Sequence, residues 1–284
     1  MKPAPFAYLR PSTLEEALAA LAGEQGAKVL AGGQSLVPLL NMRLAAPSML
    51  VDINALPDLG HVRVAEDGVR VGALARHAEV LASAEAAHAQ PLLGMALSHV
   101  AHPTIRNRGT TVGSIVHADA AAEMPMVLRL LEGSVDVASV RGRRTVPAAE
   151  LFAGPLESTL GHDEIAVQAF FPGLAPGAGV AFQEIARRHG DYALVGVAAH
   201  VETEGDAVTR ARLGFVSVSD VPTVVDVTDA LDDPAGTALT ELEPADDIHA
   251  TAAYRAHLVR VLAPRVLAAA TDHARSRAGE AIHP

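Results

Sequence analysis

The sequence contains no cysteine and no tryptophan, and its aromatic residues are only three tyrosines and six phenylalanines. Without cysteine, the chain cannot form a disulfide, use a thiol nucleophile or ligate an iron–sulfur cluster. Basic residues are also few, since 22 lysines and arginines stand against 33 acidic residues and give a formal net charge of −11. This charge argues against nucleic acid or an anionic membrane as a partner.

Long apolar runs and several catalytic signatures are absent as well. No window approaches the roughly 18 apolar residues of a membrane helix, and the N-terminus lacks the apolar segment of a signal peptide. The chain has no nucleophile elbow, no HExxH, no Walker lysine and no GxGxxG, so it carries no Rossmann fingerprint. Half of its 284 residues are hydrophobic, which is enough for two domains. We therefore expect a soluble, cytoplasmic protein with helices and strands.

The predicted elements change in character along the chain. The first 55 residues are typical of a strand, a helix, a strand, a glycine turn and a helix. The next part contains hairpins at 62–73 and 135–146, helices at 77–89 and 91–101, and a strand at 164–170. The proline- and glycine-rich segment 172–179 is the expected domain boundary.

Beyond this boundary the pattern predicts a small antiparallel sheet with helices. Three strands are expected, at 180–186, 193–201 and 209–218. The polar segment 229–247 is expected to form a loop and a capped helix. A helix over 250–277 should follow, kinked or split at Pro264.

The most informative short segment is residues 29–36 (VLAGGQSL), which predicts a buried strand, a tight turn and the start of a helix. Gly32 and Gly33 permit positive φ and the close approach of a ligand. Ser35 is a candidate cap for the helix, whose N–H groups and positive dipole end face the turn. Such a turn suits a phosphate or a diphosphate, although many similar turns only connect a strand to a helix.

A second candidate lies in the long polar stretch 102–119, where residues 108–114 (RGTTVGS) contain two glycines. A long loop without low complexity in a compact domain is usually functional. Two anion-binding turns suit a diphosphate better than a single phosphate, because both halves need N–H donors. The sequence therefore favours a dinucleotide cofactor. Arg106 and Arg108 either add positive charge there or are ordinary solvated arginines.

Four further side chains allow two interpretations each. His117, Asp119 and Glu123 are residue types that bind metals, but no second ligand pair has a strong spacing, so a structural role is favoured. Asp119 is a candidate cap for the helix that carries Glu123; alternatively, either carboxylate contacts a ribose hydroxyl or a flavin edge. Tyr192 enters a strand, where tyrosine usually packs, whereas in a flavoprotein it would stack on the isoalloxazine ring.

Taken together, these segments resemble the FAD-binding medium subunit of the molybdenum hydroxylases, the xanthine dehydrogenase and carbon monoxide dehydrogenase family. The resemblance covers nearly the whole chain and depends on collinear motifs: AGGQSL at 31–36, LVDI at 50–53, IRNRGT at 105–110, HADAAAEMP at 117–125, RRHGDYA at 187–193 and YRAHL at 254–258. It implies an α+β fold with a two-part FAD-binding domain of the vanillyl-alcohol-oxidase (PCMH) type, at 1–55 and 56–173. A small C-terminal domain with a three-stranded antiparallel sheet and helices would occupy 178–284.

By the same resemblance the cofactor is FAD, and the family's binding positions fall on a defined set of residues. The set is Ala31, Gly32, Gly33, Gln34, Ser35, Leu36, Val100, Thr110, Thr111, Gly113, Ser114, Asp119, Glu123, Ile165, Gln183 and Tyr192. The two glycine segments would hold the pyrophosphate, and Asp119 and Glu123 would lie near the ribose. Val100 would contact the flavin nucleotide, Ile165 would lie near the adenine, and Tyr192 would cover the isoalloxazine ring. No catalytic side chain is expected, because the flavin carries the chemistry.

Two positions depart from the family pattern. The second segment usually has the form Thr-Ile-Gly-Gly, but Val112 stands where a glycine is expected. Because valine adopts positive φ poorly, we expect this loop to follow a different path or FAD to bind more weakly. Gln183 replaces a lysine of some relatives, which removes a cation near the flavin and leaves the redox potential and the electron acceptor open.

The resemblance also implies partner chains: a small subunit with two [2Fe–2S] clusters and a large molybdopterin subunit, assembled as a dimer of heterotrimers. The large subunit would oxidise the substrate, the small one would relay electrons, and FAD on this chain would pass them to an external acceptor. Two alternatives stay open, a stand-alone FAD-dependent oxidase and a non-catalytic nucleotide-binding or assembly protein. Val112 is the best argument for the latter.

Overall fold

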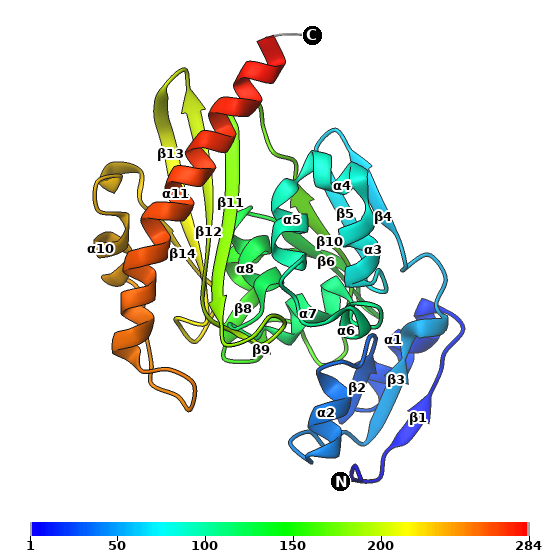
Figure 1. Cartoon of the computed structure of the whole chain (residues 1–284). Helices are drawn as coiled ribbons and strands as arrows, with labels where there is room; N and C mark the ends of the chain where they lie inside the picture. Colours follow the sequence, from blue (N-terminus) through cyan, green and yellow to red (C-terminus); the bar gives the residue numbers. More distant parts are fainter. Residues whose placement is uncertain (1, 283–284) are drawn as a thin grey trace.

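The computed structural model describes residues 2–282 as three main sheets with helices packed around them (Figure 1). The small N-terminal sheet (blue) lies beside the middle part (cyan to green), and the C-terminal sheet (yellow-green to yellow) lies on the other side of the middle part. Within the described residues, no helix is both long and apolar enough to cross a lipid bilayer.

The N-terminal part is a parallel sheet with the strand order β1-β3-β2. Its elements are β1 (Ala7–Leu9), α1 (Leu14–Gly23), β2 (Ala27–Leu30), α2 (Leu36–Asn41), β3 (Met49–Asp52) and the 3-10 turn η1 (Ile53–Ala55). The predicted order of strand, helix, strand, turn and helix is confirmed. Because β2 and β3 are parallel neighbours, with Leu30 opposite Asp52, the segments that follow both strands lie at one edge of the sheet.

The middle part contains an antiparallel sheet with the order β4-β5-β10-β6-β7. Its strands are β4 (Val62–Ala65), β5 (Gly68–Gly72), β6 (Ser134–Ser139), β7 (Gly142–Pro147) and β10 (Ile165–Pro172), with a separate small hairpin of β8 (Phe152–Gly154) and β9 (Glu157–Ser158). Both predicted hairpins, β4–β5 and β6–β7, are confirmed. Strand β10 pairs with β5 on one side and with β6 on the other, so it joins the two hairpins into one sheet.

The helices of the middle part are shorter and more numerous than the sequence predicts. They are α3 (His77–Ala82), α4 (Ala84–Ala89), α5 (Pro91–Leu97), α6 (Pro103–Arg106), α7 (Thr111–His117), α8 (Glu123–Leu130) and α9 (Ala148–Leu151). The helix expected at 77–89 is interrupted at Ser83, whose hydroxyl accepts a hydrogen bond from the Ala86 N–H at 3.2 Å and so caps α4. The stretch 102–119 is not a continuous loop, because it contains α6 and α7.

The C-terminal sheet has four antiparallel strands in the order β11-β12-β13-β14, not three. They are β11 (Ala178–Ala186), β12 (Ala193–Glu204), β13 (Ala207–Val216) and β14 (Thr223–Asp226); the helices are η2 (Thr228–Ala230), α10 (Pro234–Leu239) and α11 (Ala252–Ile282). Strand β14 was not predicted, because it is only four residues long and has polar ends. It pairs with residues Arg212 to Phe215 of β13.

Pro264 does not split the long C-terminal helix, since α11 is continuous through it. Proline removes one backbone donor, but buried residues on both sides, among them Leu262 and Val266, pack α11 against the C-terminal sheet. Figure 1 shows α11 (orange to red) lying across this sheet. Tertiary packing therefore outweighs the cost of the missing hydrogen bond.

Helix α8 connects the middle part to the C-terminal sheet. Its residues from Glu123 to Leu128 are buried, and it contacts β12, β13 and β14. One apolar cluster accordingly includes Leu128 of α8, Phe171 of β10 and Phe182 of β11. The C-terminal sheet is thus packed against the middle part through a shared core.

Candidate functional site

The first glycine turn connects β2 to α2, and its two glycines serve different purposes. Gly33 has φ +73°, a conformation that favours glycine. A Cβ on Gly32 would lie 2.5 Å from the Arg108 carbonyl oxygen and 2.8 Å from the Gly109 Cα. Gly32 is therefore required because the backbone of the second segment packs directly against it.

Ser35 does not act as the predicted helix cap. Its hydroxyl makes no capping hydrogen bond, and its backbone (φ −94°, ψ −46°) is already helical. A capping residue usually has extended backbone, which directs its side chain back to the N–H groups of the first turn. Gln34 instead donates a hydrogen bond from Nε2 to the Gly32 carbonyl at 3.2 Å and closes the turn.

The second segment is the start of helix α7 and not a glycine loop. Thr110 is buried, and its hydroxyl accepts a hydrogen bond from the Gly113 N–H at 3.2 Å, which caps the helix. A Cβ on Gly113 would collide with this hydroxyl. Val112 has helical backbone and is buried in the core. The expectation that Val112 diverts the loop was therefore wrong, because no positive φ is needed at that position.

The two segments meet at a cavity of about 360 Å³. Its lining includes Leu30, Ala31, Gly32, Gly33, Gln34, Val37, Pro38, Asp52, Asn54, Ile105 and Arg108. Asp52 is the last residue of β3, the parallel neighbour of β2, and Asn54 lies two residues further on. Asn54 is not among the residues predicted from the sequence, although a polar residue just after the strand next to the glycine turn was a usable signal.

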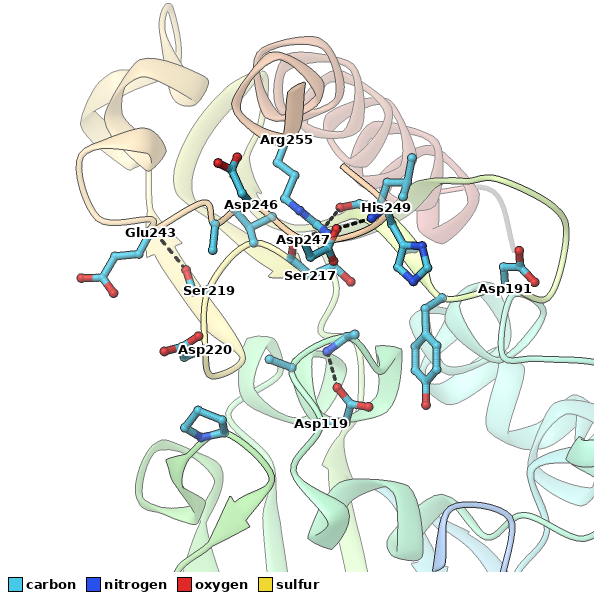
Figure 2. A pocket seen from close by; sticks show the side chains of 18 of the residues that line it. Asp119, Asp191, Ser217, Ser219, Asp220, Glu243, Asp246, Asp247, His249 and Arg255 are labelled. Carbon is cyan, nitrogen blue, oxygen red and sulfur yellow. Dashed lines mark hydrogen bonds and ion pairs between the residues drawn. The ribbon is translucent and has the colours of Figure 1, made fainter. Parts of the chain in front are cut away.

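A larger cavity of about 670 Å³ lies between the middle part and the C-terminal sheet, and it is lined by Tyr192 and Asp119. Figure 2 shows its acidic lining. The carboxylates are Asp119, Asp191, Asp220, Glu243, Asp246 and Asp247. Arg255 is buried there and donates hydrogen bonds to Asp247 Oδ2 at 2.5 Å and to the Ser217 carbonyl at 2.7 Å. The charge of this arginine is thus already paired.

Asp119 closes a turn before α8 and is not the cap of that helix. Its Oδ1 accepts a hydrogen bond from the Ala121 N–H at 2.9 Å (Figure 2), whereas the capping position of α8 is Ala122. Tyr192 is 64% exposed but stands in this concave site, where partial withdrawal from water and the nearby Asp119 carboxylate raise its pKa to about 12. The phenol is therefore neutral at any physiological pH.

Glu123 is a buried carboxyl at the first position of α8. Burial raises its pKa to about 8, and the nearby Glu184 carboxylate adds to this shift. His99 Nδ1 lies 3.2 Å from Glu184 Oε1. The other carboxylate oxygen, Glu184 Oε2, is buried and has no hydrogen-bond partner among the described residues. At neutral pH Glu123 accordingly carries a proton and offers a hydroxyl donor.

Ten predicted positions line neither of the two cavities: Ser35, Leu36, Val100, Thr110, Thr111, Gly113, Ser114, Glu123, Ile165 and Gln183. Ile165 is buried in the core at the start of β10, Val100 is partly buried against the same core, and the Gln183 side chain is exposed on β11. Among residues 2–282 no three histidine or carboxylate side chains lie close enough together to hold a metal ion. His117 ends α7, and burial lowers its pKa.

Two backbone segments that meet at a sheet edge, one of them a glycine turn before a helix, are features of a dinucleotide-binding protein. The family model described as the FAD binding domain in molybdopterin dehydrogenase matches residues 4–174, and that described as the CO dehydrogenase flavoprotein C-terminal domain matches residues 180–270. The chain belongs to this family of molybdenum hydroxylase flavoprotein subunits.

Individual relatives are similar to this chain over nearly its full length. The chain is 41% identical to the 6-hydroxypseudooxynicotine dehydrogenase complex subunit alpha of Paenarthrobacter nicotinovorans, with 97% of each chain covered. It is 36% identical to the caffeine dehydrogenase subunit beta of a Pseudomonas species, with 96% and 97% covered. Among solved structures, the carbon monoxide dehydrogenase of Hydrogenophaga pseudoflava superposes with a TM-score of 0.90 at 31% identity, covering 96% of this chain and 99% of that one.

The protein is therefore an FAD-binding medium subunit of the carbon monoxide and xanthine dehydrogenase type, with an electron-transfer role in an oxidoreductase complex. The residues present fit an anionic cofactor, because Gly32 and Gly33 line the smaller cavity without side chains and Arg108 adds a positive charge to its lining. The predicted family, α+β fold class and FAD cofactor are confirmed.

Proposed function

We propose that the residues predicted from the sequence hold FAD, with its diphosphate in the smaller cavity, beside the contact of the two glycine segments. The observation that carries this proposal is the contact between Gly32 and the backbone of residues 108–110, since it brings the two segments together with no side chain between them. Ala31, Gly32, Gly33, Gln34, Ser35 and Leu36 supply one side, and Thr110, Thr111, Gly113 and Ser114 supply the other. The N–H groups of the first turn and the Arg108 side chain suit a diphosphate, whereas the N–H groups of Thr111, Gly113 and Ser114 already donate within the fold.

The other residues of the set bind the rest of the cofactor. Asp119 accepts hydrogen bonds from ribose or ribityl hydroxyls, and Glu123, which is protonated at neutral pH, donates one. Tyr192 covers the isoalloxazine ring, an aromatic contact that its position beside Asp119 at the larger cavity supports. Val100 and Ile165 give apolar contacts along the nucleotide. Gln183 leaves the flavin without the cation that some relatives supply.

FAD, when bound, supplies the electron-transfer chemistry between iron–sulfur clusters and an external acceptor. The clusters belong to a small [2Fe–2S] subunit and the substrate site to a large molybdopterin subunit, in a cytoplasmic dimer of heterotrimers. The absence of cysteine from this chain supports that division, because the chain cannot ligate a cluster. We divide the chain into FAD-binding parts 1–55 and 56–173 and a C-terminal domain 178–284, which agrees with the separate sheets.

Expression of the chain with and without its neighbouring subunits tests this proposal. Bound flavin together with co-purifying iron–sulfur and molybdenum subunits is the expected result. Flavin with substrate turnover by the isolated chain would instead establish a stand-alone oxidase. A colourless chain that takes up no FAD would overturn the proposal in favour of a nucleotide-free assembly protein.

Exchange of Tyr192 tests the stacking role separately. Tyr192→Ala should alter the flavin absorption spectrum and the kinetics with electron acceptors, whereas Tyr192→Phe, which keeps the ring, should retain both. An unchanged spectrum and unchanged acceptor kinetics in Tyr192→Ala would remove Tyr192 from the site.

A further inference from the structure

Arg76 is hydrogen-bonded directly to the second glycine segment and, through Asn54, to the first. Its Nη1 donates to the Arg108 carbonyl oxygen at 2.7 Å, and its Nη2 donates to Asn54 Oδ1 at 2.8 Å. Asn54 in turn donates from Nδ2 to the Ala31 carbonyl oxygen at 2.8 Å. A continuous chain of hydrogen bonds thus runs from the backbone of the first turn to the backbone of the second through two side chains.

Asn54, at one end of this chain, is fixed by the N-terminal sheet. Its backbone N–H donates to Asp52 Oδ1 at 2.9 Å and its Nδ2 approaches the same oxygen at 2.6 Å. Asp52 also accepts a hydrogen bond from the Tyr8 hydroxyl on β1. Asn54 is therefore held in one orientation, with its amide nitrogen toward Ala31.

Arg76, at the other end, is fixed by the start of α3. Its backbone N–H donates to Glu79 Oε2 at 2.7 Å, and the neighbouring His77 N–H donates to the Gly109 carbonyl oxygen at 3.0 Å. His77 Nδ1 also lies 3.1 Å from the Thr111 hydroxyl. The start of α3 consequently holds the second segment at three points, Arg108, Gly109 and Thr111.

We propose that Asn54 and Arg76 are positioning residues that set the separation of the two glycine segments and thereby the affinity for FAD. The proposal rests on the diphosphate lying in the smaller cavity, beside the contact of those segments. Donors that are pre-set at the required separation bind without the cost of ordering two mobile segments. A guanidinium suits this role because its planar nitrogen atoms reach two acceptors at once, whereas a lysine ammonium on its single stem is not a geometric equivalent.

FAD titration of the cofactor-free full chain tests this role. Arg76→Met should raise the FAD dissociation constant by about tenfold to a hundredfold, as expected for two lost hydrogen bonds from a charged group. Asn54→Ala should have a similar effect. Arg76→Lys keeps the charge but loses the paired geometry, so it should fall between Arg76→Met and the unchanged protein.

The matched control is Arg70→Met, which removes two hydrogen bonds to Asp67 in the same part of the chain, away from both segments. It should leave the FAD dissociation constant unchanged. The double variant Asn54→Ala/Arg76→Met should bind FAD no more weakly than the weaker single variant, because both changes interrupt one bridge. Thermal unfolding of the cofactor-free proteins shows whether the affinity loss is separate from a loss of folding.

Three results would overturn the positioning role: dissociation constants in both single variants equal to that of the unchanged chain, additive losses in the double variant, or an affinity loss no greater than that of Arg70→Met at equal thermal stability. Should Arg76→Met fail to fold, Arg76→Lys and Asn54→Ser carry the same comparison. A chain that takes up no FAD before any substitution would overturn the proposed function itself. Tight FAD binding by every variant would overturn only the positioning role.

Discussion

The two cavities of this protein differ in where they lie and in the charge that they present. The smaller one lies where two glycine segments meet, and its charged lining residues are Asp52 and Arg108. The larger one is lined by six carboxylates, against Arg187, Arg255 and His249. Because a diphosphate is anionic, the difference in charge favours the smaller cavity for the phosphates and disfavours the larger one.

Gly32→Val tests the smaller cavity and has the largest expected effect. A side chain at Gly32 has no space, since its Cβ would lie 2.5 Å from the Arg108 carbonyl oxygen and 3.0 Å from the Thr110 nitrogen. The two segments would have to separate, so the purified variant should retain no FAD. Flavin absorbance per chain is the measurement.

Gly94→Ala is the control for this substitution, because no atom lies within 4 Å of the position of its Cβ. It should keep full flavin content and gain stability by about 0.5–1 kcal/mol, as expected for alanine in a helix. A yellow Gly32→Val protein with one flavin per chain would refute the assignment of the diphosphate to this cavity.

How far the sequence predicts these sites depends on where their contacts lie along the chain. The first glycine turn was predictable because both glycines and both flanking elements are adjacent in sequence. The role of Arg76 was not, since its acceptors lie 22 and 32 residues away. The helical state of residues 111–117 was hidden as well, because threonine and valine are weak helix formers; burial of Val112 and Ile115 stabilises that helix.

The second prediction concerns Glu123, between the middle part and the C-terminal sheet. Its pKa in the folded chain is about 8, against 4.5 for the free group, and burial is the main cause. The folded state therefore binds a proton that the unfolded state has released, and stability falls as pH rises from about 4.5 to about 8. Glu184, His99 and Asp119 are the charged neighbours that act on Glu123.

Glu123→Gln is neutral at every pH and should remove this dependence. Relative to the unchanged chain, the variant should gain a few kcal/mol in free energy of unfolding above about pH 8 and little at about pH 5. Urea unfolding of the cofactor-free protein at both pH values measures this. Glu150→Gln, at an exposed position, is the control and should not alter the slope. Parallel pH profiles of Glu123→Gln and the unchanged chain would contradict the raised pKa.

Reversal of one charge in each cavity tests which of the two cavities holds the diphosphate. Arg108 lines the smaller cavity with an exposed side chain, and Asp220 lines the larger. Arg108→Glu places a negative charge beside the proposed diphosphate and should raise the FAD dissociation constant about tenfold at low salt, less at high salt. Asp220→Lys should change it by less than about twofold. Equal effects of the two reversals would show that the diphosphate is not confined to the smaller cavity.

The smallest expected effects distinguish the two glycine segments from each other. Thr110 caps α7 through the Gly113 N–H and is buried, so Thr110→Ala should lower the free energy of unfolding by about 1 kcal/mol. Ser35 makes no capping hydrogen bond, so Ser35→Ala should change stability by less than about 0.5 kcal/mol. Urea unfolding of the cofactor-free chain measures both, and Thr110→Ser, which keeps the hydroxyl, should restore most of the loss.

The same pair of variants also separates structure from binding. A Ser35→Ala protein of unchanged stability but weaker FAD binding would mean that the Ser35 hydroxyl contacts the cofactor, as its place in the proposed set requires. Because this hydroxyl makes no capping bond in the fold, it is free to donate to a phosphate oxygen without a cost in stability. If Ser35→Ala instead destabilised the chain as much as Thr110→Ala, both segments would be capped helix starts, and the distinction between them would be wrong.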